Sequence, residues 1–155
     1  MKTLICYTSK QGTTLKCSKM IATQTENPEV IDVHKISSKG LEDYDQIYLG
    51  TPVYYGRINK TMNKFIQQNK DLLLTKELKI FTTGMDDKEV HVTHQKNFDE
   101  DILNHAVIKY VGGGYHFEKM NFMERLIVKR IASITESFEN IREDNITELI
   151  EEHKV

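Results

Sequence analysis

The fold is decided by residues 3–14, which read Thr3-Leu4-Ile5-Cys6-Tyr7-Thr8 and then Ser9-Lys10-Gln11-Gly12-Thr13-Thr14. The first half is an apolar run without polar alternation, which is typical of a strand buried on both faces in a parallel sheet. The second half is hydroxylated, is broken by a glycine and leads into a helical pattern. Backbone N–H groups and the helix dipole favour an anion at such a turn, and hydroxyls add donors. The turn therefore predicts phosphate binding, although Ser and Thr could equally serve only to cap the helix.

The turn matches neither of two common nucleotide motifs. No Gly-Lys-Ser/Thr sequence closes it, so it is not a Walker loop, and it lacks the Gly-x-Gly-x-x-Gly spacing of a dinucleotide fingerprint. Gly12 would let the backbone approach a ligand closely, since glycine tolerates conformations that other residues avoid. The local pattern thus indicates an anion site of a different kind.

Composition narrows the class of protein. At 155 residues, with 39% hydrophobic and 28% charged residues, the chain is expected to form one soluble globular domain over residues 1–155. A net charge of −2 argues against a nucleic-acid binder. We expect a cytoplasmic protein, because the N-terminus does not resemble a signal peptide and no apolar run is long enough to span a bilayer. Cys6 and Cys17 are expected to be buried thiols, too few for an iron–sulfur cluster.

Strand-type and helical patterns alternate along the rest of the chain. Further strands are expected over residues 30–36 (at or near a sheet edge), 46–50, 78–83 and 107–111, the last stopped by Gly112-Gly113-Gly114. Helices are expected over residues 15–25, 58–70, 94–105, 117–134 and 145–153, the last capped by Asp144 or Asn145. The two histidines in residues 91–94 are expected to lie in a surface loop rather than in a metal site. Alternation of this kind predicts a parallel sheet with helical crossovers.

Three of the expected strand ends carry distinctive loops, over residues 8–14, 51–57 and 83–87. Ligands of open parallel sheets bind at the carboxyl ends of the strands, so these loops are expected to lie together. The first suits a phosphate, and the second offers the rings of Tyr54 and Tyr55. The combination predicts a mononucleotide with a large planar ring. Gly56 would allow a peptide beside that ring to turn over.

The stretches Tyr7-Thr8-Ser9-Lys10-Gln11-Gly12-Thr13-Thr14 and Asp43-Tyr44-Asp45-Gln46-Ile47-Tyr48-Leu49-Gly50-Thr51-Pro52-Val53-Tyr54 resemble the flavodoxin-like proteins, which bind FMN. The resemblance implies a three-layer sandwich with five parallel strands in the order 2-1-3-4-5 and an extra helix after strand five. It implies phosphate binding by Thr8, Ser9, Lys10, Gln11, Gly12, Thr13 and Thr14. It implies ring binding by Thr51, Pro52, Val53, Tyr54, Tyr55 and Gly56, and by Thr83, Gly84, Met85 and Asp86. The chain departs from the family in having Lys10 where many short-chain flavodoxins have Thr, and in lacking the usual Gly-Asp and aromatic pattern in the third loop.

Within the family, the chain most resembles the branch that contains menaquinone-dependent protoporphyrinogen dehydrogenase, through the first loop, Tyr55-Gly56 and residues 121–129. The resemblance implies an electron carrier for a partner protein or, alternatively, a quinone-linked dehydrogenase acting on a porphyrinogen; no side chain is expected to be a catalyst. A flavin-free interaction module is the alternative of another class. The helix expected over residues 118–133 has a broad apolar arc and net positive charge, which indicates either a core helix or a docking surface for a partner, a quinone or a membrane.

Overall fold

A computed structural model describes residues 1–9, 12–84, 87–115 and 138–154 of the chain. Five parallel strands form the main sheet in the order β2-β1-β3-β5-β6, which is the order that the resemblance implied. Their bounds are β1 Thr3–Tyr7, β2 Pro28–Asp32, β3 Gln46–Tyr54, β5 Glu77–Thr83 and β6 Val107–Tyr110. A short strand, β4 (Arg57–Ile58), turns back from β3 and pairs with it antiparallel.

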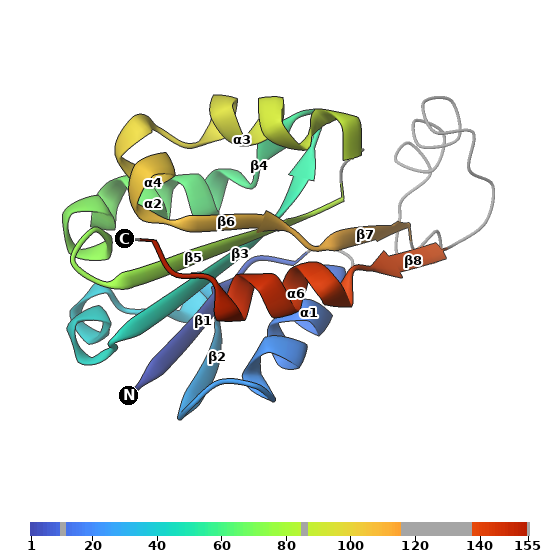
Figure 1. Ribbon diagram of the computed structural model, residues 1–155. Helices are drawn as coiled ribbons and strands as arrows, with labels where there is room; N and C mark the ends of the chain where they lie inside the picture. Colours follow the sequence, from blue (N-terminus) through green and yellow to red (C-terminus); the bar gives the residue numbers. More distant parts are fainter. Residues whose placement is uncertain (10–11, 85–86, 116–137, 155) are drawn as a thin grey trace.

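Helices cover both faces of this sheet (Figure 1). One face carries α1 (Thr13–Ala22) and α6 (Glu143–Glu151), and the other carries α2 (Lys60–Leu73), α3 (Val90–Asn97) and α4 (Glu100–His105). Because side chains alternate along a strand, β1 sends Leu4 and Cys6 into the core under α2 and sends Ile5 into the core under α1 and α6. The apolar run at residues 3–6 is therefore needed to fill two cores at once, as its composition predicted.

The edge position of β2 is confirmed, since this strand pairs only with β1 and keeps its residues exposed or half-buried. It begins at Pro28, earlier than expected, and the chain then forms a 3₁₀ helix over Val33–Lys35. The Asp32 carboxylate accepts a hydrogen bond from the His34 N–H (2.9 Å) and starts this 3₁₀ turn. A second 3₁₀ helix occupies Ser38–Asp43.

Two expectations for the central part of the chain need correction. Residues 94–105 form two helices instead of one, since α3 ends at Asn97 and α4 begins at Glu100 after its N-cap residue Asp99. The His91–His94 segment lies within α3 and not in a loop. A helix forms here because α3 covers the end of β5, where the buried His94 ring is hydrogen-bonded to Thr82.

The glycine run after β6 was also interpreted wrongly. Residues Gly112–Tyr115 form strand β7, which pairs antiparallel with β8 (Phe138–Ile141) to make a separate two-stranded sheet. A side chain at Gly112 would place its Cβ 2.0 Å from the Asn140 carbonyl oxygen, and its φ is +105°. Glycine is therefore required for this pairing. The helix expected over residues 117–134, including the surface at 118–133, lies outside the described residues.

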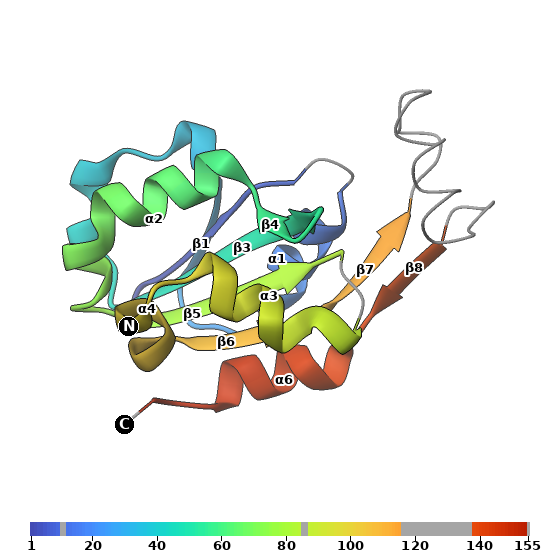
Figure 2. The same ribbon diagram turned by 90° about the horizontal axis from the view of Figure 1, so that it is seen from above.

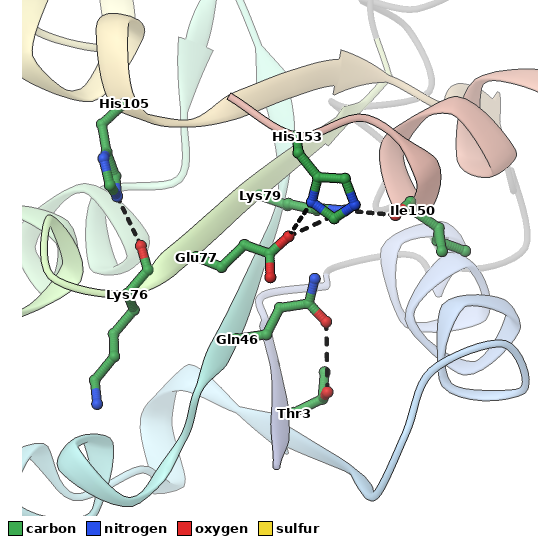
Figure 3. A network of polar contacts seen from close by, with 8 residues as sticks. All are labelled: Thr3, Gln46, Lys76, Glu77, Lys79, His105, Ile150 and His153. Carbon is green, nitrogen blue, oxygen red and sulfur yellow. Dashed lines mark hydrogen bonds and ion pairs between the residues drawn. The ribbon is translucent and has the colours of Figure 1, made fainter. Parts of the chain in front are cut away.

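The last helix, α6, begins at Glu143 rather than Asn145, and neither proposed residue caps it. Asn145 instead donates a hydrogen bond to the Tyr110 carbonyl oxygen (2.7 Å), which fixes α6 against β6. The other end of α6 is held by Lys79, a fully buried residue of β5 whose Nζ donates to the Ile150 carbonyl oxygen at 2.5 Å (Figure 3). Burial lowers the pKa of this lysine, while Glu77 and Glu152 partly oppose that shift. A cation at a helix C-terminus stabilises the free carbonyl groups there.

Candidate functional site

The three predicted loops meet at one edge of the sheet, beyond the carboxyl ends of β1, β3 and β5 (Figure 2). The first loop is joined to β3 by the Thr8 N–H, which donates to the Gly50 carbonyl oxygen (2.9 Å). It is joined to the third loop by the hydroxyls of Thr14 and Thr83, which lie 3.0 Å apart. Residues that are 69 positions apart in sequence are thus in direct contact. The expected convergence of the loops is observed.

The first loop contains a buried hydroxyl without a partner. Thr8 is 2% exposed, and its Oγ1 makes no hydrogen bond within the described part of the chain. Buried polar atoms are rarely left unpaired, because the cost of removing them from water is then not recovered. The Ser9 hydroxyl has a role within the turn, because its Oγ accepts from the Gly12 N–H (3.0 Å), but no such contact accounts for the Thr8 hydroxyl. An anion with acceptor oxygens would provide the missing partner.

Helix α1 begins directly after this loop. Its N-cap residue is Gly12, in a left-handed conformation with φ of +94° and no side chain to cap the helix. Thr13 and Thr14 occupy the first turn and are buried. The N–H groups of the first helical turn therefore lie next to the loop, as an anion site requires. Lys10 and Gln11 lie outside the described residues.

The second loop is a tight hairpin between β3 and β4. Its two central residues, Tyr55 and Gly56, have φ values of +53° and +73°. This is the arrangement of a type I′ turn, which usually contains Asn-Gly. Tyr54 and Tyr55 are 41% and 74% exposed, so both rings are available to a ligand or a partner.

The remaining predicted residues of this segment lie inside β3. Thr51, Pro52 and Val53 are buried. The Thr51 hydroxyl is already used within the protein, because it accepts from the Asn59 N–H (3.1 Å) and donates to the Pro52 carbonyl oxygen (3.1 Å). These residues support the hairpin from within the strand.

The third loop starts with Thr83 and Gly84; Met85 and Asp86 lie outside the described residues. Gly84 has a φ of +80°, and its N–H donates to the Gly112 carbonyl oxygen (3.0 Å). A side chain at Gly113 would place its Cβ 3.0 Å from the backbone of Gly84. The glycine run of β7 therefore passes against the third loop, a role that could not be derived from the sequence.

His94 contacts the strand residue that leads into this loop. Its Nε2 lies 2.8 Å from the hydroxyl of Thr82, the residue before Thr83, and the ring is buried. Burial, with a smaller contribution from His91, lowers the pKa of His94 to about 4. The imidazole is thus neutral at physiological pH and acts as a hydrogen-bonding group rather than as a charge.

Asn97 is the residue of this region that the sequence analysis missed. Its side-chain amide contacts the hairpin at two points, accepting from the Ile58 N–H (3.0 Å) and donating to the Gly56 carbonyl oxygen (2.8 Å). The sequence offered no signal for this role, because Asn97 fell inside the helix expected over residues 94–105.

The two thiols and the histidines do not add reactive groups. Cys6 and Cys17 are buried, as expected, and burial, followed by the effect of Asp32, raises the pKa of Cys6 to about 12. Within the described residues, no group of three or more His, Cys, Asp or Glu side chains could hold a metal ion. No helix in the same part of the chain is long and apolar enough to cross a membrane.

Comparison with known proteins gives concordant results. A model of the flavodoxin domain matches residues 4–141. Protoporphyrinogen IX dehydrogenase [quinone] of Escherichia coli K12 is 26% identical over 73 residues, which are 44% of this chain and 40% of that protein. A flavodoxin of Clostridium saccharobutylicum is 32% identical over 83 residues, 50% of this chain and 52% of that protein.

The similarity to these two relatives therefore spans about half of their length or less. Among solved structures, a Streptococcus pneumoniae TIGR4 flavodoxin superposes with a TM-score of 0.57 at 16% identity, over 86% of this chain and 100% of that chain. The strand order, the three converging loops and the match over residues 4–141 place this chain in the flavodoxin family.

Proposed function

We propose that this chain is an FMN-dependent electron-transfer protein that exchanges electrons with a partner protein. FMN is the cofactor that the flavodoxin family implies, and it supplies the redox chemistry when bound. The side chains near the site include no candidate nucleophile or acid–base pair among the described residues. The protein's part is therefore to bind the cofactor, shield it and tune it.

The observation that carries the proposal is the unpaired, buried Thr8 hydroxyl beside the N-terminus of α1. The phosphate would be held there by the hydroxyls and backbone N–H groups of Thr8, Ser9, Gly12, Thr13 and Thr14, with Lys10 and Gln11 as further predicted contacts. An interaction module that had lost its ligand would gain nothing from keeping this hydroxyl unsatisfied. The donor set thus favours the cofactor-binding alternative.

The ring would lie between the second and third loops. Tyr54, Tyr55 and Gly56 offer aromatic faces and an accessible backbone, with Thr83 and Gly84 opposite and Met85 and Asp86 predicted beside them. Thr51, Pro52 and Val53 contribute as the buried base of the hairpin. Because the residues are on a tight turn, small backbone adjustments there would tune the potential.

The surface beside this turn favours a protein partner with acidic groups. Residues 54–64 contain Arg57, Lys60 and Lys64 and no Asp or Glu, and all three basic side chains are exposed. Complementary charge accelerates encounter and orients two proteins. The basic, aromatic surface at residues 54–64 therefore suits contact with an acidic redox protein.

A second candidate function is quinone-linked oxidation of a porphyrinogen. The similarity to the Escherichia coli protoporphyrinogen IX dehydrogenase [quinone] favours it. A shared fold does not transfer a substrate, so the two candidates need to be separated by experiment. The surface predicted at residues 118–133 would serve either a quinone, a partner or a membrane.

The test begins with FMN added to the purified protein, followed by gel filtration and a visible spectrum. Retention of one flavin per chain is expected at micromolar protein concentrations; a spectrum without a flavin band would refute the proposal. The reduced holoprotein is then mixed either with an acidic redox protein such as a ferredoxin or with the quinone menadione. Salt-sensitive oxidation by the acidic protein supports the carrier, whereas oxidation by menadione with porphyrin fluorescence from added protoporphyrinogen supports the dehydrogenase.

A further inference from the structure

We infer that Asn97 is a positioning residue that holds the Tyr55–Gly56 turn in one conformation and thereby sets how tightly FMN is bound and how easily it is reduced; the cofactor part of this inference rests on the proposed function. Asn97 is the last residue of α3, which runs beside β4 (Figure 1). It lies 41 positions from Gly56 in sequence. The contact therefore joins the helix that follows the third loop to the second loop.

The Asn97 amide bonds to the backbone beside β4 as a neighbouring strand would. Gly56 in the turn and Ile58 on β4 are two residues apart, and the Gly56 C=O and the Ile58 N–H both contact the Asn97 amide. A carboxamide carries one acceptor and two donors, so it can replace a neighbouring peptide group at the edge of a strand. Its second donor contacts the Thr93 carbonyl oxygen (2.8 Å), which fixes the amide to α3.

The turn needs such support because it contains a strained residue. Tyr55 adopts a φ of +53°, in a region that bulky side chains rarely occupy. Tyr55 is largely exposed and makes no hydrogen bond to a described residue, so its own contacts do not hold it there. Strained conformations of this kind persist only where the surrounding structure fixes them. Asn97 supplies that restraint on the strand leaving the turn.

Fixing the Gly56 carbonyl has a specific consequence for the cofactor. The peptide between Gly56 and Arg57 cannot rotate without losing the Asn97 contact, whereas the peptide between Tyr55 and Gly56 has no such restraint. A redox state of the ring that needs the Gly56–Arg57 peptide to rotate would cost the Asn97 contact, so Asn97 favours the state that matches the turn as it stands. A restraint shifts an equilibrium only through its different effect on the two states.

The variant Asn97→Asp tests this inference selectively. Aspartate has nearly the same shape and keeps an acceptor for the Ile58 N–H, but it has no N–H for Gly56 and places negative charge against that carbonyl oxygen. We expect the Kd for oxidised FMN to rise about tenfold, and the Kd for reduced FMN to rise less. The two-electron midpoint potential would then become less negative, by about 30 mV for each tenfold difference between the effects on the two Kd values.

Asn69→Ala provides a matched control. Asn69 is buried in α2 and donates to the Phe65 carbonyl oxygen (2.9 Å), the same i−4 contact that Asn97 makes with Thr93. Both variants are expected to lower the melting temperature, but only Asn97→Asp should move the potential. Equal Kd values and potentials in the two variants and the wild type would show that Asn97 is merely structural and would overturn the inference.

Amide spectra of the apoprotein separate this inference from the proposed function. Asn97→Asp should shift the ¹⁵N–¹H signals of Gly56, Arg57 and Ile58, whereas Asn69→Ala should leave them in place. Unchanged signals would refute the restraint itself, whether or not FMN binds. Failure of the wild type to bind FMN would instead overturn the proposed function and the cofactor part of the inference. Should Asn97→Asp not fold, Asn97→Ser, a short uncharged replacement, carries the same measurements.

Discussion

Replacing Thr8 by Val should stabilise the apoprotein while weakening its affinity for FMN. The Thr8 side chain is 2% exposed and its hydroxyl has no partner among the described residues, so the folded apoprotein bears the cost of desolvating it. An unsatisfied buried polar group costs about 1–3 kcal/mol. Valine keeps the shape and removes the hydroxyl, so the free energy of unfolding should rise by about 1 kcal/mol. For a chain of this size, that corresponds to a melting temperature about 2–4 °C higher.

The holoprotein should respond in the opposite direction. A hydroxyl that donates to a charged phosphate contributes about 1.5–3 kcal/mol, so its loss should raise the Kd for FMN by about 10- to 100-fold. Urea denaturation of the apoprotein measures the first effect, provided that the m-value is unchanged. Titration with FMN, followed by quenching of flavin fluorescence, measures the second.

Thr14→Val is the matched control, because the same chemical change there removes a hydroxyl that is already paired. Thr14 Oγ1 lies 3.0 Å from Thr83 Oγ1, and breaking that contact should destabilise the apoprotein by about 1–2 kcal/mol. The free energy of unfolding of the apoprotein should therefore rise in Thr8→Val and fall in Thr14→Val. Two results would refute the assignment of the Thr8 hydroxyl to the FMN phosphate. One is a loss of stability in Thr8→Val as large as that in Thr14→Val, and the other is wild-type affinity of Thr8→Val for FMN.

Two further predictions concern the frame around the site. In Gly50→Ala, the new Cβ would lie 2.2 Å from Cζ of the fully buried Phe81 ring, so we expect a loss of about 3 kcal/mol, at the upper end for overpacking. In a double-mutant cycle measured by urea denaturation, adding Phe81→Leu should make the combined loss at least about 1 kcal/mol smaller than the sum of the two single losses. Strictly additive losses would contradict the predicted clash. For His94, the pKa is lowered from 6.5 to about 4 on folding, so the unfolded chain binds more protons between these values. The contribution of neutral His94 to the free energy of unfolding, up to about 3 kcal/mol, should be complete above pH 6.5 and lost as the pH falls towards 4. His94→Gln should flatten the plot of urea-derived stability against pH in this range. An unaltered slope would exclude His94 as the source of the pH dependence.

The features predicted correctly from the sequence are those set by local burial. The run Leu4-Ile5-Cys6 has to be apolar on both faces because it lies between two helical layers, and that requirement is visible without a structure. The mixed apolar and polar pattern expected over residues 30–36 likewise indicated an edge strand, and β2 is exposed or half-buried along its length. The strand order depends on long-range pairing and was available only through the resemblance to the flavodoxin family.

The features predicted wrongly depend on partners distant in sequence. Gly112-Gly113-Gly114 has low strand propensity, and it forms a strand because β8 supplies the partner and Gly84 requires close passage of the backbone. His94 is polar, yet it is buried because the Thr82 hydroxyl pairs with it. Asn145 looks like a helix cap, but its amide is used across the fold at Tyr110. In each case a tertiary contact overrides the local preference.

The same principle accounts for how this site is built. Each loop is held by a contact from another element: the Thr14 hydroxyl meets Thr83, the Asn97 amide meets Gly56, and the Gly112 carbonyl oxygen meets the Gly84 N–H. Loops on a rigid sheet would otherwise vary in position, and a cofactor site without catalytic side chains depends on position above all. Because Thr14 belongs to the proposed phosphate end and Thr83 to the proposed ring end, the two ends share a hydrogen bond, and a shift of one should move the other. Coupling between the halves of the site therefore follows from the fold itself and does not require a conformational change.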